Sequence, residues 1–282
     1  MMKYQKVKYL TSQGKEKLIG NSGCKLSIFK DKIYQVRKQS TNSLNSKRLY
    51  KQYLKILNFK NFRNISVPKI HNQKKHKKLF YYDMEYINGP TLSLYLMTQP
   101  ISLTNIMINY VLNFIFNCKK KSLRKYNKTQ FIKKIKDLQK KIYFKSYFYK
   151  EIFKTLQSYN WDNIDESKSH GDLSLENIII KNDTIKFIDV SENFVDSYKL
   201  DISKILFDLI SFWSFRNASL KIDTLKINSL KIYLLDVLSK KLSKNDFDDI
   251  KMLIILDFLR VLHYTKKKEE IGLLKKKLKK FY

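Results

Sequence analysis

The spacing of apolar and polar residues predicts a strand-rich first third of the chain and a helical remainder. Before residue 90, short runs of β-forming residues alternate with turn residues, which is typical of strands. The predicted strands are 17–19, 25–29, 32–37, 66–70 and 79–86. One helix interrupts them at 43–59, where Ser43 or Asn45 can cap its start. The last hairpin has its loop at 73–78, so we expect its run of lysines to be solvated.

After Asn88, Gly89 and Pro90 the periodicity becomes helical. Amphipathic stretches follow at 92–97, 103–118, 129–142, 149–159, 200–215, 226–240, 247–264 and 268–281. The best candidate for a membrane span, 101–116, is too short and carries asparagines at positions 105, 109 and 113, which form one polar stripe. That stripe fits a helix buried in a globular domain, so we expect no membrane span.

An island of strands interrupts this helical part of the chain. Residues 169–190 are predicted to form a loop, a strand at 178–181, a turn at Asn182 and Asp183, and a second strand at 185–190. A strand-turn-strand unit inside a helical region calls for an explanation other than packing.

The loop of this island has the clearest chemical pattern in the chain. His170, Asp172 and Asn177 follow the spacing H-x-D-L-x-x-x-N of the protein-kinase catalytic loop, and Asp189 ends the strand pair. Any one of these residues alone would fit a plain turn or strand end, but the four at this spacing favour a kinase-like site. Because Gly171 replaces the arginine of protein kinases, the segment resembles the aminoglycoside phosphotransferase and choline kinase family, the small-molecule branch of the protein-kinase-like fold.

The resemblance implies a role for each of these residues. Asp172 would orient the acceptor hydroxyl and accept its proton, while Asn177 and Asp189 would hold Mg²⁺ against the nucleotide phosphates as hard oxygen ligands. Phosphoryl transfer has a loose transition state, so positioning and charge neutralisation carry most of the catalysis. His170 would be structural, and Asp201, which opens the next helix, would bond the backbone of the loop.

The resemblance also implies two lobes joined by a hinge. We expect an α+β, two-lobed protein-kinase-like fold, with a small β-rich nucleotide-binding lobe at 1–87 and a larger, mainly helical catalytic lobe at 88–282. The sequence MEYINGPT at 84–91 is similar to the family's hinge. There the backbone carbonyl of Glu85 and the N–H of Ile87 would bond the purine edge, although a strand ending in a Gly-Pro turn describes the same residues without a ligand.

Lys38 is the candidate for the phosphate-contacting lysine of this family. Arg37 is adjacent, and alternation along a strand turns only one of the two toward the cleft. The family pairs this lysine with a glutamate on the following helix, but that helix has no acidic residue here, and Gln52 is the nearest polar substitute. The sequence GNSG at 20–23 stands where a phosphate-covering loop is expected, and it fits a plain hairpin turn equally well.

The composition shows a large excess of basic residues but does not identify a binding partner. The 282 residues include 57 Lys and Arg against 25 Asp and Glu, a formal net charge of +32. Such charge suggests nucleic acid or an anionic membrane, but the lysines are spread over nearly every segment, as an AT-rich coding bias produces. No aromatic-basic motif of a nucleic-acid reader is present, so we expect no specific nucleic-acid partner. Two cysteines without metal-ligand spacing and no visible signal peptide indicate a cytoplasmic protein.

With the resemblance, these features predict an enzyme that uses Mg²⁺ and ATP, with GTP as an alternative donor, to phosphorylate a hydroxyl of a small molecule. The acceptor stays open among a sugar, a surface-glycan precursor, an amino alcohol and an aminoglycoside-like compound. A cationic acceptor needs an acidic pocket. The candidates for it, which also fit plain helix-start charge, are Asp162, Asp165, Glu166, Asp248 and Asp249. The alternative function, favoured by the missing helix glutamate, is a catalytically weak kinase-like module that binds nucleotide or a partner.

Overall fold

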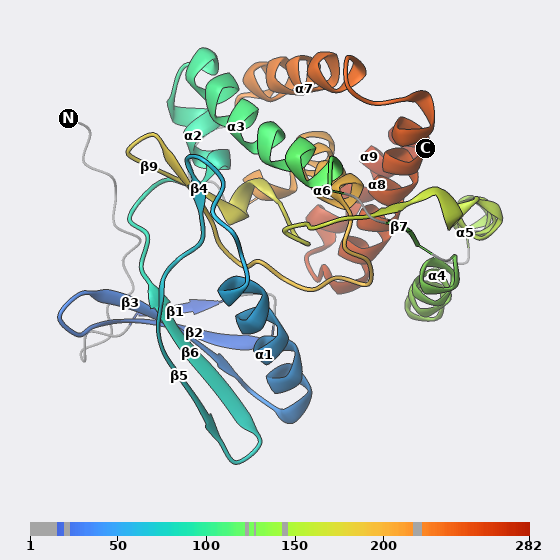
Figure 1. Cartoon of the computed structure of the whole chain (residues 1–282). Coiled ribbons are helices and arrows are strands. Elements are labelled where there is room, and N and C mark those ends of the chain that lie inside the picture. Colours follow the sequence, from blue (N-terminus) through green and yellow to red (C-terminus); the bar gives the residue numbers. More distant parts are fainter. Residues whose placement is uncertain (1–15, 20–22, 122–123, 127, 143–145, 217–221) are drawn as a thin grey trace. The chain divides into compact units, whose positions relative to one another are not determined.

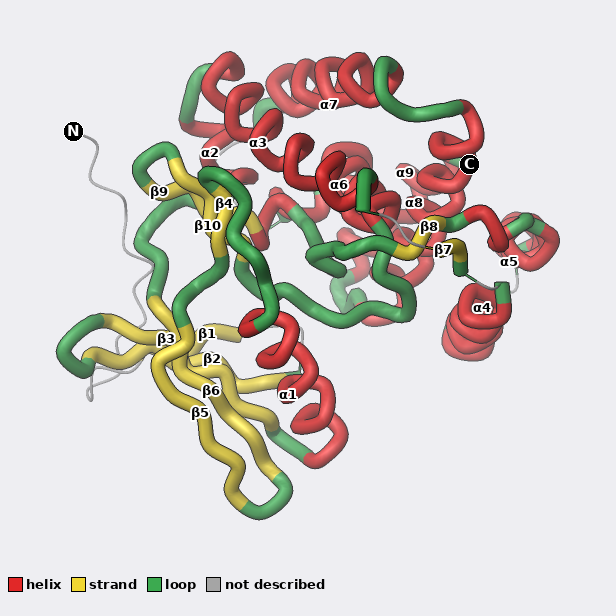
Figure 2. The backbone as a smooth tube through the Cα atoms, viewed as in Figure 1, coloured by secondary structure: helices red, strands yellow, loops and turns green. Residues whose placement is uncertain are grey.

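The computed structural model describes residues 16–19, 23–121, 124–126, 128–142, 146–216 and 222–282 (Figure 1). The chain divides into two compact units. The first consists of Met1–Asn61 and Ser66–Asn88, and the second of Phe62–Ile65 and Gly89–Tyr282. The first unit holds a sheet and one long helix, and the second is mainly helical (Figure 2). Phe62–Ile65, which the sequence analysis assigns to the N-terminal lobe, is thus part of the second unit.

An antiparallel sheet of five strands, in the order β1-β2-β3-β6-β5, forms the first unit. The strands are β1 (Glu16–Ile19), β2 (Cys24–Lys30), β3 (Tyr34–Ser40), β5 (Ile70–His76) and β6 (Leu79–Glu85). The prediction of a loop at 73–78 was wrong, because β5 continues to His76 and the turn is only Lys77 and Lys78. Its side chains after Ile70 are exposed. An edge strand needs no apolar alternation when backbone bonds to its one neighbour hold it, so the apolar pattern missed it.

The helix α1 (Ser43–Leu57) packs on β3 and β6 (Figure 1). Asn42 caps its start, because the Asn42 side chain accepts the N–H of Asn45 at 2.8 Å. On the buried side, the Tyr53 ring lies 5.5 Å from the Phe80 ring and 5.9 Å from the Tyr82 ring. This contact covers one face of the sheet and leaves the other face uncovered by α1.

The second unit is organised around α6 (Tyr198–Ser211), of which every residue except Ile210 is buried. The other described helices are α2 (Leu92–Thr98), α3 (Ile101–Lys119), α4 (Thr129–Lys141), α5 (Tyr147–Ser158), α7 (Thr224–Ser239), α8 (Lys244–Tyr264) and α9 (Lys268–Phe281). Of these, α8 makes the most extensive contact with α6. Since α6 carries charged residues at buried positions, each of these needs a partner inside the unit.

Two short strand pairs complete the second unit. The predicted hairpin is present: β9 (Ile178–Lys181) pairs with β10 (Thr184–Phe187), and Ile178 stands opposite Phe187. β4 (Ile65–Ser66) extends this sheet on the β10 side. β7 (Arg124–Lys125) pairs with β8 (Asp165–Glu166). The hairpin turn at Asn182 and Asp183 is left-handed, a conformation that these two residue types tolerate well.

Among the described helices, α3 alone is long and apolar enough to cross a membrane by length and composition. Its inner face, which includes Ile108, Val111 and Ile115, is buried in the second unit. The predicted polar stripe lies at the edge of this buried face, where Asn109 donates to the hydroxyl of Tyr233 in α7. These contacts are those of a core helix.

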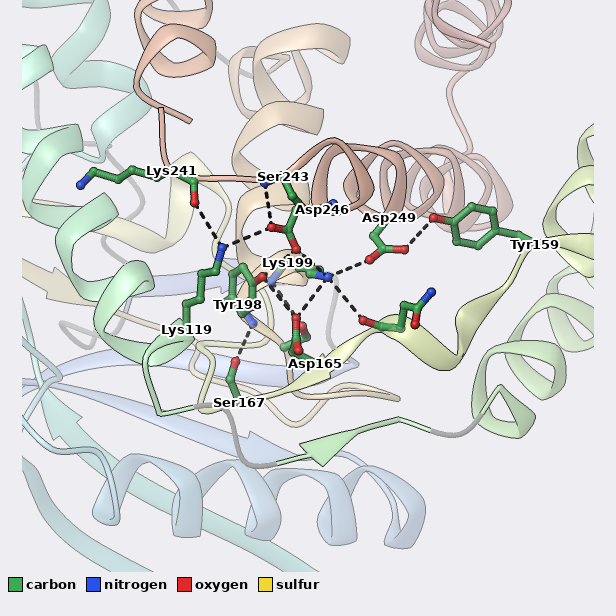
Figure 3. Close-up of polar contacts among 12 residues, drawn as sticks. Lys119, Tyr159, Asp165, Ser167, Tyr198, Lys199, Lys241, Ser243, Asp246 and Asp249 are labelled. Atoms are coloured by element: carbon green, nitrogen blue, oxygen red, sulfur yellow. Dashed lines mark hydrogen bonds and ion pairs between the residues drawn. The ribbon is translucent and has the colours of Figure 1, made fainter. Parts of the chain in front are cut away.

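A buried cluster of ions holds β8, α6 and α8 together (Figure 3). The Nζ atom of Lys199, whose side chain is 3% exposed, lies 3.1 Å from Asp165, 2.8 Å from Asp246 and 2.7 Å from Asp249. The Tyr198 hydroxyl also donates to Asp246 at 3.0 Å. Burial lowers the pKa of Lys199, but the hydrogen bonds that it donates to the carboxylates outweigh this and raise it to about 12. Burial raises the pKa of Asp246, but the bond from Lys199 holds it well below its usual value.

We expect Lys199→Met to lower the free energy of unfolding by about 3–5 kcal/mol, because it leaves the buried carboxylate of Asp249 without its cation and removes a cation from Asp165 and Asp246. Urea unfolding would measure this. The exposed pair of Lys240 with Asp236 provides the control: Lys240→Met should cost less than about 1 kcal/mol. In the wild type, the contribution of Asp246 should disappear as the pH falls below about 4, and that of Lys199 as the pH rises through about 12. Equal losses in the two variants would contradict this account.

Gly89 lies where two backbone segments come closest. A Cβ atom at this position would stand 2.1 Å from the carbonyl oxygen of Ile180, so the backbone would have to move. The neighbouring bond, from the Ile180 N–H to the Pro90 carbonyl at 2.9 Å, anchors the start of the second unit to β9.

We therefore expect Gly89→Ala to lower the free energy of unfolding by about 2 kcal/mol or more, through steric overlap with β9. Gly272 in α9 is the matched control, because nothing lies within 4 Å of a Cβ added there. Gly272→Ala should raise stability by up to about 1 kcal/mol, since alanine favours a helix. Chemical denaturation of both variants tests the pair, and a tolerated Gly89→Ala would refute the close approach.

Candidate active site

The carboxylate of Asp201 in α6 holds the predicted catalytic loop in place through two hydrogen bonds. Oδ2 accepts the N–H of His170 at 2.7 Å, and Oδ1 accepts the N–H of Gly171 at 2.9 Å. Asp201 is 1% exposed, so it satisfies two backbone donors that would otherwise be buried without partners. The expectation that Asp201 bonds the backbone of the loop is confirmed.

His170 links the loop to the end of the hairpin. It is completely buried, its Nδ1 atom accepts the N–H of Asp172 at 3.2 Å, and its Nε2 atom lies 2.9 Å from the carbonyl of Ile188. These partners suit a neutral ring that carries its proton on Nε2. His170 therefore ties Asp172 to the residue before Asp189, which is the structural role expected of it.

The two predicted metal ligands lie next to each other beyond the open end of the hairpin. Asn177 is the last residue of the short helical turn η2 (Leu175–Asn177), and its backbone carbonyl accepts the N–H of Ile188 at 3.0 Å. Its side-chain NH₂ group donates to the Asp172 carbonyl at 2.8 Å, so Oδ1 is the side-chain atom that could bind a metal. Asp189 has a left-handed backbone, with φ of 58°, directly after the strand. The structure thus brings Asp172, Asn177 and Asp189 together.

The chemistry of this donor set fits Mg²⁺. No group of three or more His, Cys, Asp or Glu side chains that could hold a metal occurs in the described part of the chain, so a zinc-type cage is absent there. An Asn oxygen and an Asp carboxylate are hard ligands, and Mg²⁺ usually takes one or two protein ligands and completes its shell with water and phosphate oxygens.

Asp172 lies among cations of the helical unit. Its side chain is 36% exposed, and its Oδ1 atom is 3.4 Å from Nη2 of Arg260 in α8 and 3.8 Å from Nζ of Lys204 in α6. Burial raises the pKa of Asp172, but the charges of these two residues outweigh it and hold the pKa below its usual value. Asp257 in α8 forms an ion pair with Lys204 and accepts a hydrogen bond from the Ser203 hydroxyl at 3.1 Å.

Asp208 is a further buried acid at the loop that the motif search did not find. Its Oδ2 atom accepts the N–H of Leu175 at 2.7 Å and the hydroxyl of Ser214. Burial raises its pKa to about 7. Asp208 and Asp201 are seven residues apart, or two helical turns, so both face the loop from one side of α6. That spacing is the sequence signal that could have identified it.

Three of the five acidic residues considered for a cationic pocket bond within the second unit. Asp165 and Asp249 belong to the Lys199 ion cluster (Figure 3). Asp162 accepts the backbone N–H of Lys128 at 2.8 Å at the start of α4, and Asp248 is exposed on α8. The first three are therefore already bonded within the unit.

The residues predicted to contact nucleotide lie in the first unit. Lys38 is 1% exposed and stands opposite Tyr82, on the face of β3 that α1 covers, where Gln52 is also buried. Arg37 points to the other face and forms a two-point ion pair with Asp83, at 2.7 and 2.8 Å. Strand alternation thus separates the two basic residues.

The predicted hinge residues follow directly at the end of β6. Glu85 closes that strand and accepts the N–H of Lys69 through its side chain at 3.3 Å, and the Ile87 side chain is buried. Of the predicted phosphate-covering loop, 20–22 lie outside the described residues; Gly23 has a left-handed backbone, with φ of 71°.

No family model and no curated protein sequence matches this chain, but solved structures do. A GDP complex of aminoglycoside 2'-phosphotransferase-IIIa aligns at a TM-score of 0.62 and 12% identity, over 97% of this chain and 95% of that one. Amicoumacin kinase, in complex with AMP-PNP and Ca²⁺, aligns at a TM-score of 0.58 and 13% identity, over 97% of this chain and 89% of that one. This chain therefore has the protein-kinase-like fold of these small-molecule kinases, which confirms the predicted fold class.

Proposed function

We propose that this protein is a kinase that transfers the γ-phosphoryl group of a nucleoside triphosphate to a hydroxyl of a small molecule. The observation that carries the proposal is the bonded group of Asp172, Asn177 and the hairpin end before Asp189, all held on α6 through Asp201. The similarity to small-molecule kinases over nearly the whole chain supports the same function. As a nucleoside triphosphate is consumed, we infer a cytoplasmic location.

Asp172 would act on the acceptor hydroxyl. Its lowered pKa keeps it ionised, so that it can accept a hydrogen bond from the hydroxyl and orient the oxygen. The acceptor oxygen forms a bond to the γ-phosphorus while the bond to the β–γ bridging oxygen breaks, and the nucleoside diphosphate leaves with that electron pair. The hydroxyl proton passes to Asp172 Oδ. A weak base suffices because the transition state is loose and the proton is lost late.

Asn177, through Oδ1, and Asp189, through its carboxylate, would hold Mg²⁺. The ion would neutralise charge on the phosphate oxygens when bound. We assign Lys38 to the nucleotide phosphates, and the backbone carbonyl of Glu85 and N–H of Ile87 to the purine edge. The similar structures include complexes with AMP-PNP and with GDP, so the donor is ATP or GTP.

We also consider a second function, because the sequence of α1 contains no acidic residue that could pair with Lys38. In this alternative the protein binds nucleotide but transfers phosphate weakly, and its role is that of a nucleotide-dependent partner-binding module. Gln52, buried on α1, can orient a lysine but cannot neutralise it.

Thermal unfolding with and without Mg²⁺ and ATP or GTP tests nucleotide binding. We expect the nucleotide to raise the Tm of the wild type, and Asp189→Ala to abolish the shift because one metal ligand is gone. Asp172→Asn should keep the shift but lower nucleotide hydrolysis or transfer by about 10²- to 10⁴-fold, the usual contribution of a general base.

Asp236→Asn on α7 is the control, because its carboxylate is exposed and forms an ion pair with Lys240. It should change neither measurement. No nucleotide-dependent shift in the wild type would refute the kinase proposal. A normal shift with hydrolysis that is insensitive to Asp172→Asn would favour the binding module.

A further inference from the structure

The candidate base lies in a basic part of the helical unit. Lys134 of α4 lines the same small cavity as Lys204, Arg260 and Asp257, together with Asn193 and Phe194 of the segment after Asp189. Its Nζ atom is 5.9 Å from the centroid of the Phe194 ring. Burial lowers the pKa of Lys134, and the charge of Arg260 lowers it further, as expected for cations that are near one another.

Two carboxylates near Asp172, those of Asp257 and Glu176, are already bound to cations of this chain. Asp257 pairs with Lys204 and lies 3.6 Å from Arg260. On the loop itself, Glu176 accepts from Arg216 at 2.9 Å, and the Arg216 guanidinium stacks on Trp213 at 4.1 Å. A positively charged acceptor would therefore have to displace one of these cations and would also face the charge of Lys134.

An anionic acceptor would instead find a cation, Arg260, that is available to bind it. Arg260 holds Asp172 in a single long contact of 3.4 Å, and its side chain is 29% exposed, so it can turn toward an arriving anion. A guanidinium forms two parallel bonds with a carboxylate or a phosphate, which is a better geometry than this contact. Binding of the anion would then release Asp172 to receive the hydroxyl.

We propose that the acceptor carries a carboxylate or phosphate group beside its reactive hydroxyl, and that Arg260 and Lys134 bind that group. This rests on the proposed kinase function, since it names the substrate class of the same site. It separates this chain from kinases of cationic acceptors, because the carboxylates of Asp165, Asp249, Asp257 and Glu176 belong to internal ion pairs.

Four sugars of similar size that differ in charge provide the test: glucose 6-phosphate, glucuronate, glucose and glucosamine. Isothermal titration calorimetry on the full chain at low salt, without nucleotide, should give dissociation constants at least about tenfold lower for an anionic sugar than for glucosamine. The phosphate and carboxylate arms distinguish the two sources of negative charge. Lys134→Glu should bring the ratio of the dissociation constants of glucosamine and the anionic sugar close to one. Lys240→Glu, at the exposed end of α7, should leave this ratio unchanged.

Binding of glucosamine as tight as that of both anions would overturn the proposal, as would an unchanged ratio in Lys134→Glu or no detectable binding of either anion. Lys134→Gln, which removes the charge without reversing it, covers the case in which the Glu variant does not fold, and it should reduce the ratio to an intermediate value. Because no nucleotide is present, these results are independent of the kinase test. A nucleotide-dependent Tm shift together with a preference for glucosamine would reject only the acceptor class.

Discussion

The buried carboxylate of Asp201 is the contact on which the candidate site depends. It lies in the core helix α6 and bonds two successive backbone N–H groups, those of His170 and Gly171. Both donors are buried, and each would cost about 1–3 kcal/mol without an acceptor. With the loop fixed there, the His170 ring reaches both the N–H of Asp172 and the carbonyl of Ile188. One carboxylate thus positions the candidate base and, through His170, the end of the strand that carries Asp189.

The same helix explains how a chain with a net charge of +32 places its few acidic residues. Four charged side chains of α6 are buried: Lys199, Asp201, Lys204 and Asp208. The two lysines are surrounded by carboxylates, and the two aspartates bond backbone N–H groups of the loop. Buried charges are tolerated only when they are paired and hydrogen-bonded. Many acidic side chains of this chain are therefore used in internal pairs. The charged side chains in contact with Asp172 are the cations Lys204 and Arg260, and this favours an anionic acceptor.

Sequence reasoning succeeded where local chemistry decides the structure. The hairpin at β9 and β10 follows from β-branched residues on both sides of an Asn-Asp turn, and the resemblance to the kinase family implied the anchoring role of Asp201. It failed for β5, where edge-strand bonding replaces apolar alternation, and it could not show that Asp165 and Asp249 pair with Lys199, because these residues meet only after the chain has folded. Arg260 was missed for a related reason: it lies 88 residues from Asp172, and no motif joins them.

The sequence by itself indicated that Asp172, Asn177 and Asp189 lie near one another, because they are close along the chain and a short loop with a hairpin links them. Strand alternation likewise determined that Arg37 and Lys38 point to opposite faces of β3. Only the tertiary structure decided which of the two is buried under α1, which acids become ion-pair partners, and which cations reach the base. These outcomes depend on contacts between helices that are distant in sequence, such as Lys204 in α6 with Asp257 in α8, and such contacts form only when apolar faces pack.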